Sequence, residues 1–151
     1  MSLSIVPVEE QHIIEICQTM RAREANAVRV LGRHPEPLLR HEIATSWMSW
    51  AGLIDEEVFA VGGIKCADFL TDEAYAWLFC SEVMARHPIA FARSVLEAFD
   101  RARARFGSIW GWVEADFTTS VRWLEWMGFH IEEPQGGMAL FWYGKPPQVR
   151  H

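Results

Sequence analysis

The histidines and cysteines are the residues of this chain that would most readily bind a metal or form covalent bonds, and their spacing argues against both. The six histidines show no paired spacing such as His-Glu-x-x-His, in which two imidazoles project from one helix face. The three cysteines, Cys17, Cys66 and Cys80, are odd in number and far apart, with no Cys-x-x-Cys pair. We therefore expect no metal site and no disulfide framework, and we interpret the cysteines as small apolar residues that are in the core or half-buried.

Tryptophan is the second chemically distinctive residue type, with eight in the chain. Trp110, Trp112, Trp123 and Trp126 lie close together in the sequence. Indole rings bind cationic or aromatic groups, so one hypothesis is a pocket for an acceptor substrate of that kind. Because these positions carry strand and helix periodicity, we favour the alternative that most of the rings belong to the core or to a contact in a homo-oligomer.

The length and composition predict a single globular domain over residues 1–151. Half of the residues are hydrophobic, which supplies enough apolar area for one full core. The net charge of −6, with arginines spread among acidic residues, argues against nucleic acid as a partner. No apolar run approaches the roughly 20 residues that cross a bilayer, and the N-terminus lacks the pattern of a signal peptide. We expect no membrane association and a cytoplasmic location.

The hydrophobic periodicity predicts the elements that must position any site, in the order strand, two helices, three strands, helix, strand, helix, two strands. The expected strands are at residues 4–6, 50–54, 58–64, 74–80, 108–113, 129–131 and 138–143, and the expected helices at about 8–20, 38–45, 88–106 and 119–127. A polar turn is expected over residues 68–73. Right-handed crossover connection makes the strands at 74–80 and 108–113 parallel. The fold class is therefore α+β, with a mixed, mostly antiparallel sheet and helices on both faces.

Two segments within this order resemble the GNAT superfamily of N-acetyltransferases. Residues 92–107, which begin Ala-Arg-Ser-Val-Leu-Glu-Ala-Phe, resemble the family's third helix, and residues 121–129, Val-Arg-Trp-Leu-Glu-Trp-Met-Gly-Phe, resemble its fourth helix. The resemblance covers nearly the whole chain by element order but only residues 74–129 by motif. Residues 86–91, Arg-His-Pro-Ile-Ala-Phe, and residues 122–129 look most similar to small GNAT-like proteins of tailed phages and prophages. The resemblance implies a GNAT-like fold and acetyl-CoA or another acyl-CoA as cofactor.

The family's pyrophosphate loop implies a cofactor site between the central strand and the helix that follows it. The loop pattern is Gln or Arg, two residues, Gly, one residue, then Gly or Ala, and backbone N–H groups at the helix N-terminus bind the phosphates. Here His87 stands at the basic position and Ala90 at the central glycine, so only the last position, Ala92, fits the pattern. The resemblance implies cofactor-binding residues in two places, the end of the central strand, where backbone amides would contribute, and the start of the helix. They are Cys80, Ser81, His87, Ala90, Phe91 and Ala92.

The resemblance also bears on the groups that would move protons. Glu82 lies just beyond the central strand, where it is the best candidate for the catalytic base. The family often has a tyrosine in the fourth helix as general acid, but Leu124 occupies that position and cannot donate a proton. The usual asparagine at the start of that segment corresponds to Phe117.

Two hypotheses from different classes follow. The first is an acyl-CoA-dependent enzyme that transfers an acetyl group to an unidentified small-molecule or protein amine. The second is a non-catalytic GNAT-like protein with a degraded cofactor site, such as a phage virion, assembly or interaction protein located in the host cytoplasm or the virion. The departures at His87, Ala90 and Leu124 favour the second hypothesis, and the intact element order favours the first.

Overall fold

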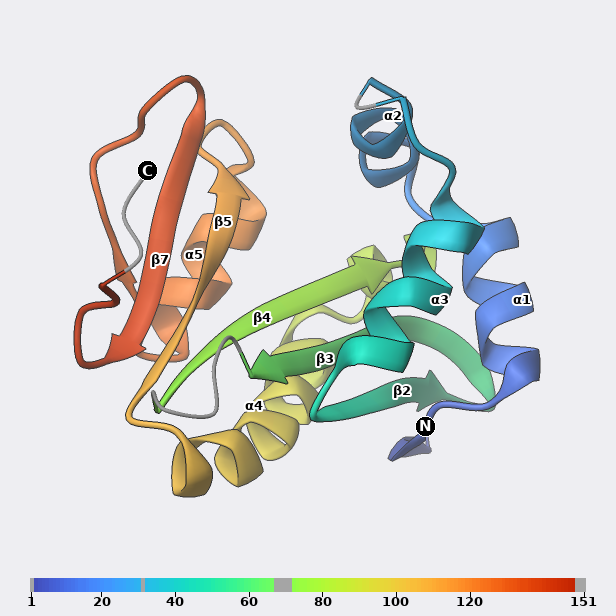
Figure 1. The fold of residues 1–151 in the computed structure, drawn as a ribbon. Coiled ribbons are helices and arrows are strands. Elements are labelled where there is room, and N and C mark those ends of the chain that lie inside the picture. Colours follow the sequence, from blue (N-terminus) through green and yellow to red (C-terminus); the bar gives the residue numbers. More distant parts are fainter. Residues whose placement is uncertain (1, 31, 67–71, 149–151) are drawn as a thin grey trace. The chain divides into compact units, whose positions relative to one another are not determined.

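Figure 1 shows the computed structural model of the chain, which describes residues 2–30, 32–66 and 72–148. The chain divides into two compact units. Unit 1 consists of Met1–Lys65 and Trp77–Ala98, and unit 2 consists of Cys66–Ala76 and Phe99–His151. That these units act as a single domain over residues 1–151 stays a prediction. Most of the polar turn predicted at residues 68–73 lies outside the described residues.

Unit 1 is built on three antiparallel strands and the end of a fourth. Its strands are β1 (Leu3–Pro7), β2 (Met48–Ile54), β3 (Glu57–Cys66) and the second half of β4 (Glu73–Cys80). Its helices are α1 (Glu10–Thr19), α2 (Ala22–Val30), α3 (Pro35–Thr45), the short 3-10 helix η1 (Glu82–Arg86) and the first part of α4 (Pro88–Arg105). Figure 1 draws α3 in front of β2 and β3 and α4 behind them, so helices cover both faces of this part of the sheet.

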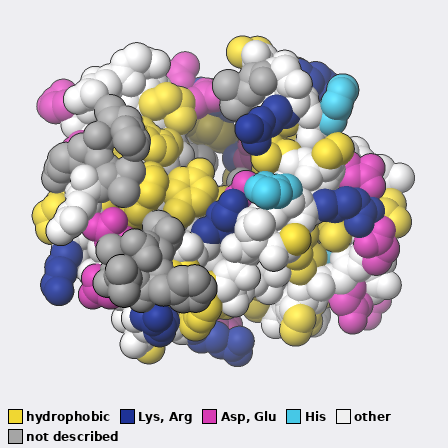
Figure 2. Space-filling view, viewed as in Figure 1, with side chains coloured by type: hydrophobic (Ala, Val, Ile, Leu, Met, Phe, Trp, Pro, Cys, Tyr) yellow, Lys and Arg dark blue, Asp and Glu magenta, His cyan; other side chains and the backbone are white. Residues whose placement is uncertain are grey.

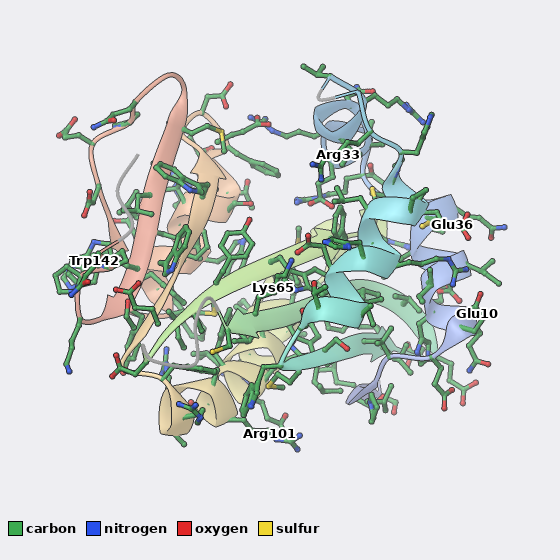
Figure 3. All side chains as sticks on the ribbon, in the orientation of Figure 1. Glu10, Arg33, Glu36, Lys65, Arg101 and Trp142 are labelled. Carbon is green, nitrogen blue, oxygen red and sulfur yellow. The ribbon has the colours of Figure 1, made fainter. Side chains whose placement is uncertain are left out.

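The hairpin between β2 and β3 is closed by Asp55 and Glu56, whose φ angles of 47° and 68° are both positive. A two-residue turn of this kind matches the twist of the strands it joins. On the surface of the same unit, Arg40 forms ion pairs with Glu10 at 2.6 Å and Glu36 at 2.9 Å, two carboxylates labelled in Figure 3. The pair with Glu10 links α3 to α1, and the pair with Glu36 lies within α3.

Unit 2 contains the first half of β4, the end of α4 and the C-terminal elements. The latter are β5 (Ser108–Glu114), α5 (Thr118–Trp126), β6 (His130–Ile131) and β7 (Met138–Gly144). Strand β4 pairs with β5 in parallel over Glu73–Tyr75 only, whereas β7 pairs antiparallel with the whole of β5 and with β6. The strand order is β1-β2-β3-β4-β5-β7-β6, which confirms the predicted mixed, mostly antiparallel sheet and its one parallel pair.

The core of unit 2 is organised around the ring of Phe129. Its centroid lies 5.5 Å from the ring of Phe99, 5.2 Å from Phe141 and 5.9 Å from Tyr143, in edge-to-face contacts. The guanidinium of Arg103 lies 4.1 Å from the Tyr143 ring centroid. Its Nη2 donates to the carbonyl oxygen of Met127 at 2.9 Å, which caps the C-terminal end of α5. Helix α4 is thereby joined to α5 and β7.

The number of helices before β2 differs from the prediction, which had two where the structure has three. Helix α1 ends at Thr19 because Met20 adopts an extended conformation, with ψ at 139°. A separate helix, α2, then begins at Ala22. The sequence of α2, Ala-Arg-Glu-Ala-Asn-Ala-Val-Arg-Val, has little apolar periodicity but consists largely of residues with high helix propensity. The helix propensity of these residues indicates α2, whereas apolar periodicity alone does not.

The indole of Trp77 packs directly against strand β3 at Gly63, which has no side chain in the way. A Cβ atom at Gly63 would lie 2.6 Å from Cζ2 of the Trp77 indole, well inside van der Waals contact. The indole Nε1 donates to Ser46 Oγ at 2.8 Å, and the side chain is 8% exposed. Gly63 therefore serves close packing between neighbouring strands.

We expect Gly63→Ala to lower the free energy of unfolding by about 1–3 kcal/mol, because the added methyl group must displace the Trp77 ring or the strand. Urea denaturation followed by tryptophan fluorescence measures this change. The control is Ser4→Ala on the exposed face of β1, which should stay within about 0.5 kcal/mol of the wild type. Equal stability of the Gly63→Ala variant and the wild type would contradict the packing described here.

Candidate functional site

The last residues of β4 direct their backbone hydrogen bonds to two different parts of unit 1. The N–H of Cys80 donates to Glu24 Oε2 at 2.6 Å, and the carbonyl oxygen of Cys80 accepts from the N–H of Arg21 at 2.9 Å. The N–H of Ser81 donates to the carbonyl oxygen of Phe59 in β3 at 2.9 Å. The backbone amides of Cys80 and Ser81, which the sequence analysis assigned to the cofactor, are thus already engaged within the protein.

The hydroxyl group of Ser81 is equally committed. It donates to the carbonyl oxygen of Val58 at 3.0 Å and accepts from the N–H of Val83 at 3.2 Å, and Ser81 is fully buried. The N–H of Val58 in turn donates to Glu15 Oε2 at 2.6 Å. Ser81 therefore joins β3 to the start of η1, and its hydroxyl is not a free nucleophile.

Glu24 is a largely buried carboxyl group held in place by hydrogen bonds at both oxygens. Its Oε1 accepts from Nε and Nη2 of Arg21, and its Oε2 accepts from Cys80. The Glu24 side chain is 17% exposed and that of Arg21 12%. Burial raises the pKa of Glu24; Arg21 and the Cys80 N–H oppose this effect, while the charge of Glu82 adds to it. Buried carboxyl groups with raised pKa values are frequent at functional sites.

The thiol of Cys80 lies within the same buried cluster. Burial raises its pKa well above the ordinary value of 9.0, and the negative charge of Glu24 raises it further, against a smaller opposing effect of Arg21. Cys80 is 1% exposed. The thiol therefore stays protonated at neutral pH.

Glu82, the predicted catalytic base, is the exposed first residue of η1. The segment that begins with Glu82 folds into a 3-10 helix, in which the N–H of Met84 donates to the carbonyl oxygen of Ser81 at 3.2 Å. The N–H of His87 donates to the carbonyl oxygen of Met84 at 3.1 Å and ends this helix. The structure thus places Glu82 next to the buried Cys80–Glu24 cluster with its side chain open to solvent.

Helix α4 begins directly after His87, with Pro88 in the first helical position. The first α-helical hydrogen bond is donated by the N–H of Phe91 to the carbonyl oxygen of His87 at 2.9 Å. Within the described part of the chain, the N–H groups of Ile89 and Ala90 have no acceptor, as expected in the first turn of a helix. The Ile89 side chain is 67% exposed. Two donors therefore lie at the positive end of an 18-residue helix, and such a helix end can bind anions.

The side chains of Phe91 and Ala92 belong to the core instead. Phe91 is 1% exposed, and its ring lies 5.6 Å from the ring of Phe59 in an edge-to-face contact. Ala92 is 5% exposed. Of the predicted residues at this helix start, Ala90 has an N–H without an acceptor among the described residues, and so does Ile89, which was not predicted.

The candidate residues of unit 2 differ in their burial. Leu124 on α5 is 3% exposed. Trp110 and Trp112 lie on one face of β5, where Trp110 is 8% exposed. On α5, Trp126 is 58% exposed. Trp110 thus follows the interpretation that placed these rings in the core.

Arg21 and Glu24 are the residues of this site that the sequence analysis did not identify. An Arg and a Glu three residues apart usually form a solvated pair on a helix surface, so their spacing carries no specific signal. Only the antiparallel bridge between Met20 and Ser81, which brings the start of α2 to the end of β4, gives the pair its position. The role of this pair therefore becomes visible only in the tertiary structure.

Among the described residues, no group of three or more His, Cys, Asp and Glu side chains is arranged to hold a metal ion. Nor does any helix in the described ranges have the length and apolar character needed to cross a membrane. On the face drawn in Figure 2, Lys and Arg side chains lie among Asp and Glu side chains.

Solved structures of N-acetyltransferases are similar to this chain over nearly its whole length. The PaiA N-acetyltransferase of Thermoplasma acidophilum, in complex with coenzyme A, is 14% identical with a TM-score of 0.70 and covers 96% of this chain and 100% of its own. The GNAT domain of S. lividans PAT is 15% identical with a TM-score of 0.68, covering 93% and 88%. The ribosomal-protein-alanine N-acetyltransferase of Brucella melitensis is 11% identical with a TM-score of 0.69, covering 94% and 99%.

No protein-family model matches the sequence, and no curated protein matches it. The structural likeness shows that the chain has the GNAT fold, which confirms the predicted fold class. At identities this low, the likeness describes the fold, and the chemistry has to be argued from the site itself.

The buried Glu24 carboxyl should make the stability of the protein depend on pH. Its pKa is higher in the folded state than the ordinary value of 4.5, so the folded state holds the proton more tightly than the unfolded state. Its contribution is fully present below the unfolded-state pKa and is lost as the pH rises through the folded-state pKa. Urea denaturation between pH 4 and pH 8 should therefore show the stability of the wild type falling relative to Glu24→Gln, which does not titrate. A constant difference between the two proteins would contradict the raised pKa.

Proposed function

We propose that this chain is an acyl-CoA-dependent N-acyltransferase acting on an amine. The observation that carries the proposal is the start of α4, directly after β4 and η1, where the N–H groups of Ile89 and Ala90 have no acceptor among the described residues. Backbone donors at a helix N-terminus bind a pyrophosphate through hydrogen bonds and the helix dipole. The GNAT fold and the coenzyme A complex of the Thermoplasma acidophilum enzyme support this assignment.

The residues at the start of α4 fit an anionic cofactor. Ile89 and Ala90 would hold the pyrophosphate through their N–H groups, and His87 would add a positive charge when it is protonated. Acyl-CoA supplies an acyl group activated as a thioester. Pro88 contributes no N–H, so this chain offers fewer donors than a helix without proline at its start.

The chain must also take a proton from the amine, which is an ammonium ion at neutral pH. Two carboxyl groups lie beside the end of β4, Glu82 and Glu24. We assign the proton to a carboxylate oxygen of Glu82, because this side chain is exposed, whereas both oxygens of Glu24 already accept hydrogen bonds. Leu124 is apolar, so a side-chain acid is lacking at that position.

The second candidate is a non-catalytic protein of the GNAT fold that acts by interaction, such as the phage virion or assembly protein suggested by the sequence resemblance. Two observations favour it: the Cys80 N–H is occupied by Glu24, and Leu124 is a buried core residue. The two candidates differ in one measurable property. Only the acyltransferase needs to bind acyl-CoA.

Isothermal titration calorimetry with acetyl-CoA tests the proposal, and a matched pair of variants at Ile89 locates the site. Ile89→Glu places a carboxylate beside the phosphates, and we expect it to weaken binding by roughly threefold to tenfold through charge repulsion. Ile89→Lys should preserve or strengthen binding. An acidic residue stabilises a helix N-terminus and a basic one destabilises it, so unfolding cannot explain this order of affinities.

Absence of acetyl-CoA binding at high micromolar concentration by the folded wild type would exclude the acyltransferase. Equal affinity of the Ile89→Glu and Ile89→Lys variants would place the binding site elsewhere. Turnover is then measured as thiol release with a panel of polyamines, amino-acid amides and short peptides. Glu82→Gln should lower the rate of release while leaving the acetyl-CoA affinity unchanged.

A further inference from the structure

The N–H of Cys80 is a backbone donor whose acceptor lies outside the sheet. The neighbouring N–H of Ser81 bonds to β3, and the Cys80 N–H bonds instead to the carboxyl group of Glu24 on α2. A charged acceptor at 2.6 Å is a strong partner. This donor is next to the segment in which the acyl-CoA site was proposed, separated from His87 only by Ser81 and η1.

Acyl transfer needs a fixed N–H donor for the carbonyl oxygen on which negative charge develops. A buried backbone N–H at the end of a strand meets this requirement because its position is set by the sheet. Ser81 cannot supply it, since its N–H and its hydroxyl both bond to β3. The Cys80 N–H, in contrast, is bonded to the side chain of Glu24. A ligand that displaced this side chain could accept a hydrogen bond from the Cys80 N–H.

We propose that Glu24 is a specificity-determining residue that competes with the acyl group of acyl-CoA for the Cys80 N–H. The inference rests on the proposed function and concerns the same site. An acyl-CoA must displace the Glu24 carboxylate to gain this hydrogen bond, whereas free CoA has no acyl oxygen and leaves Glu24 in place. Glu24 therefore lowers the affinity for acyl-CoA relative to CoA.

Several charged or titratable groups face Glu24. Arg21 pairs with it from the residues before α2, the thiol of Cys80 lies on β4, and Glu82 acts on it from η1. Burial and Glu82 favour the protonated carboxyl, and Arg21 and the Cys80 N–H favour the carboxylate. Protonation removes the charge that makes Glu24 a strong acceptor, so the competition weakens as the pH falls.

The test compares acetyl-CoA with CoA by calorimetry, and the measured quantity is the ratio of the two dissociation constants. We expect Glu24→Ala to shift this ratio by about tenfold in favour of acetyl-CoA. Any change in attraction to the phosphates, such as that from removing the negative charge beside Arg21, acts on both ligands and cancels in the ratio. Glu10→Ala is the matched control, since it also removes a carboxylate paired with an arginine, Arg40, but does not contact Cys80. Its ratio should equal that of the wild type.

The wild-type protein provides a second measurement that needs no variant. Its ratio should shift in favour of acetyl-CoA as the pH is lowered from 8 to 4.5, because the pKa of Glu24 is raised above 4.5 and its protonated fraction grows as the pH falls. A change in the charge of the CoA phosphates affects both ligands equally. If Glu24→Ala does not fold, this pH series decides the question, and a ratio independent of pH overturns the inference.

Each remaining outcome separates the inference from the proposed function. A folded Glu24→Ala variant with the wild-type ratio overturns the role of Glu24 and leaves the acyltransferase proposal intact. Failure of both ligands to bind the wild type and the variant overturns the two proposals together. Tighter acetyl-CoA binding in Glu24→Ala with an unchanged CoA affinity supports both.

Discussion

The backbone N–H and carbonyl groups at the end of strand β4 are buried and must therefore be hydrogen-bonded within the protein. Arg21, just before α2, donates to the Cys80 carbonyl oxygen, and Glu24 on α2 accepts from the Cys80 N–H. The Ser81 N–H donates to Phe59 in β3, and the Ser81 carbonyl oxygen accepts from Met84 in η1. This requirement explains why α1 stops at Thr19 and why an ion pair is retained in a largely apolar setting. It also bears on where η1 begins, because the Ser81 hydroxyl accepts a hydrogen bond from the N–H of Val83 in the first turn of that helix.

Much of the fold was predictable from the sequence because its strongest signals are local. Residues 74–80 are apolar on both faces, and residues 88–106 combine a helical stripe with proline at the start and glycine after the end. These patterns predicted β4 and α4 correctly, and the helical connection between the strands predicted that β5 pairs in parallel with β4. Helix α2 was missed because its residues favour a helix by propensity and lack an apolar stripe.

The site was less predictable, because its decisive contacts join residues far apart in the sequence. Glu24 and Cys80 form their hydrogen bond only after α2 and β4 have come together. Phe91 and Ala92 illustrate a second limit. Their positions in the loop pattern assigned them to the cofactor, yet the helical stripe to which they also belong turns both side chains into the core. At these two residues the cofactor-loop pattern and the helical apolar stripe overlap, and the structure follows the apolar stripe because this buries apolar area.

The buried thiol of Cys80 has a consequence for chemical reactivity. A cysteine beside a bound thioester can exchange acyl groups with it, and only the thiolate form of the cysteine is the nucleophile in that exchange. Burial and the negative charge of Glu24 both raise the pKa of Cys80, so the thiolate fraction at neutral pH is very small. An acyl-CoA bound at the end of β4 would therefore meet a protonated sulfur, and the protein would be protected from acylating itself.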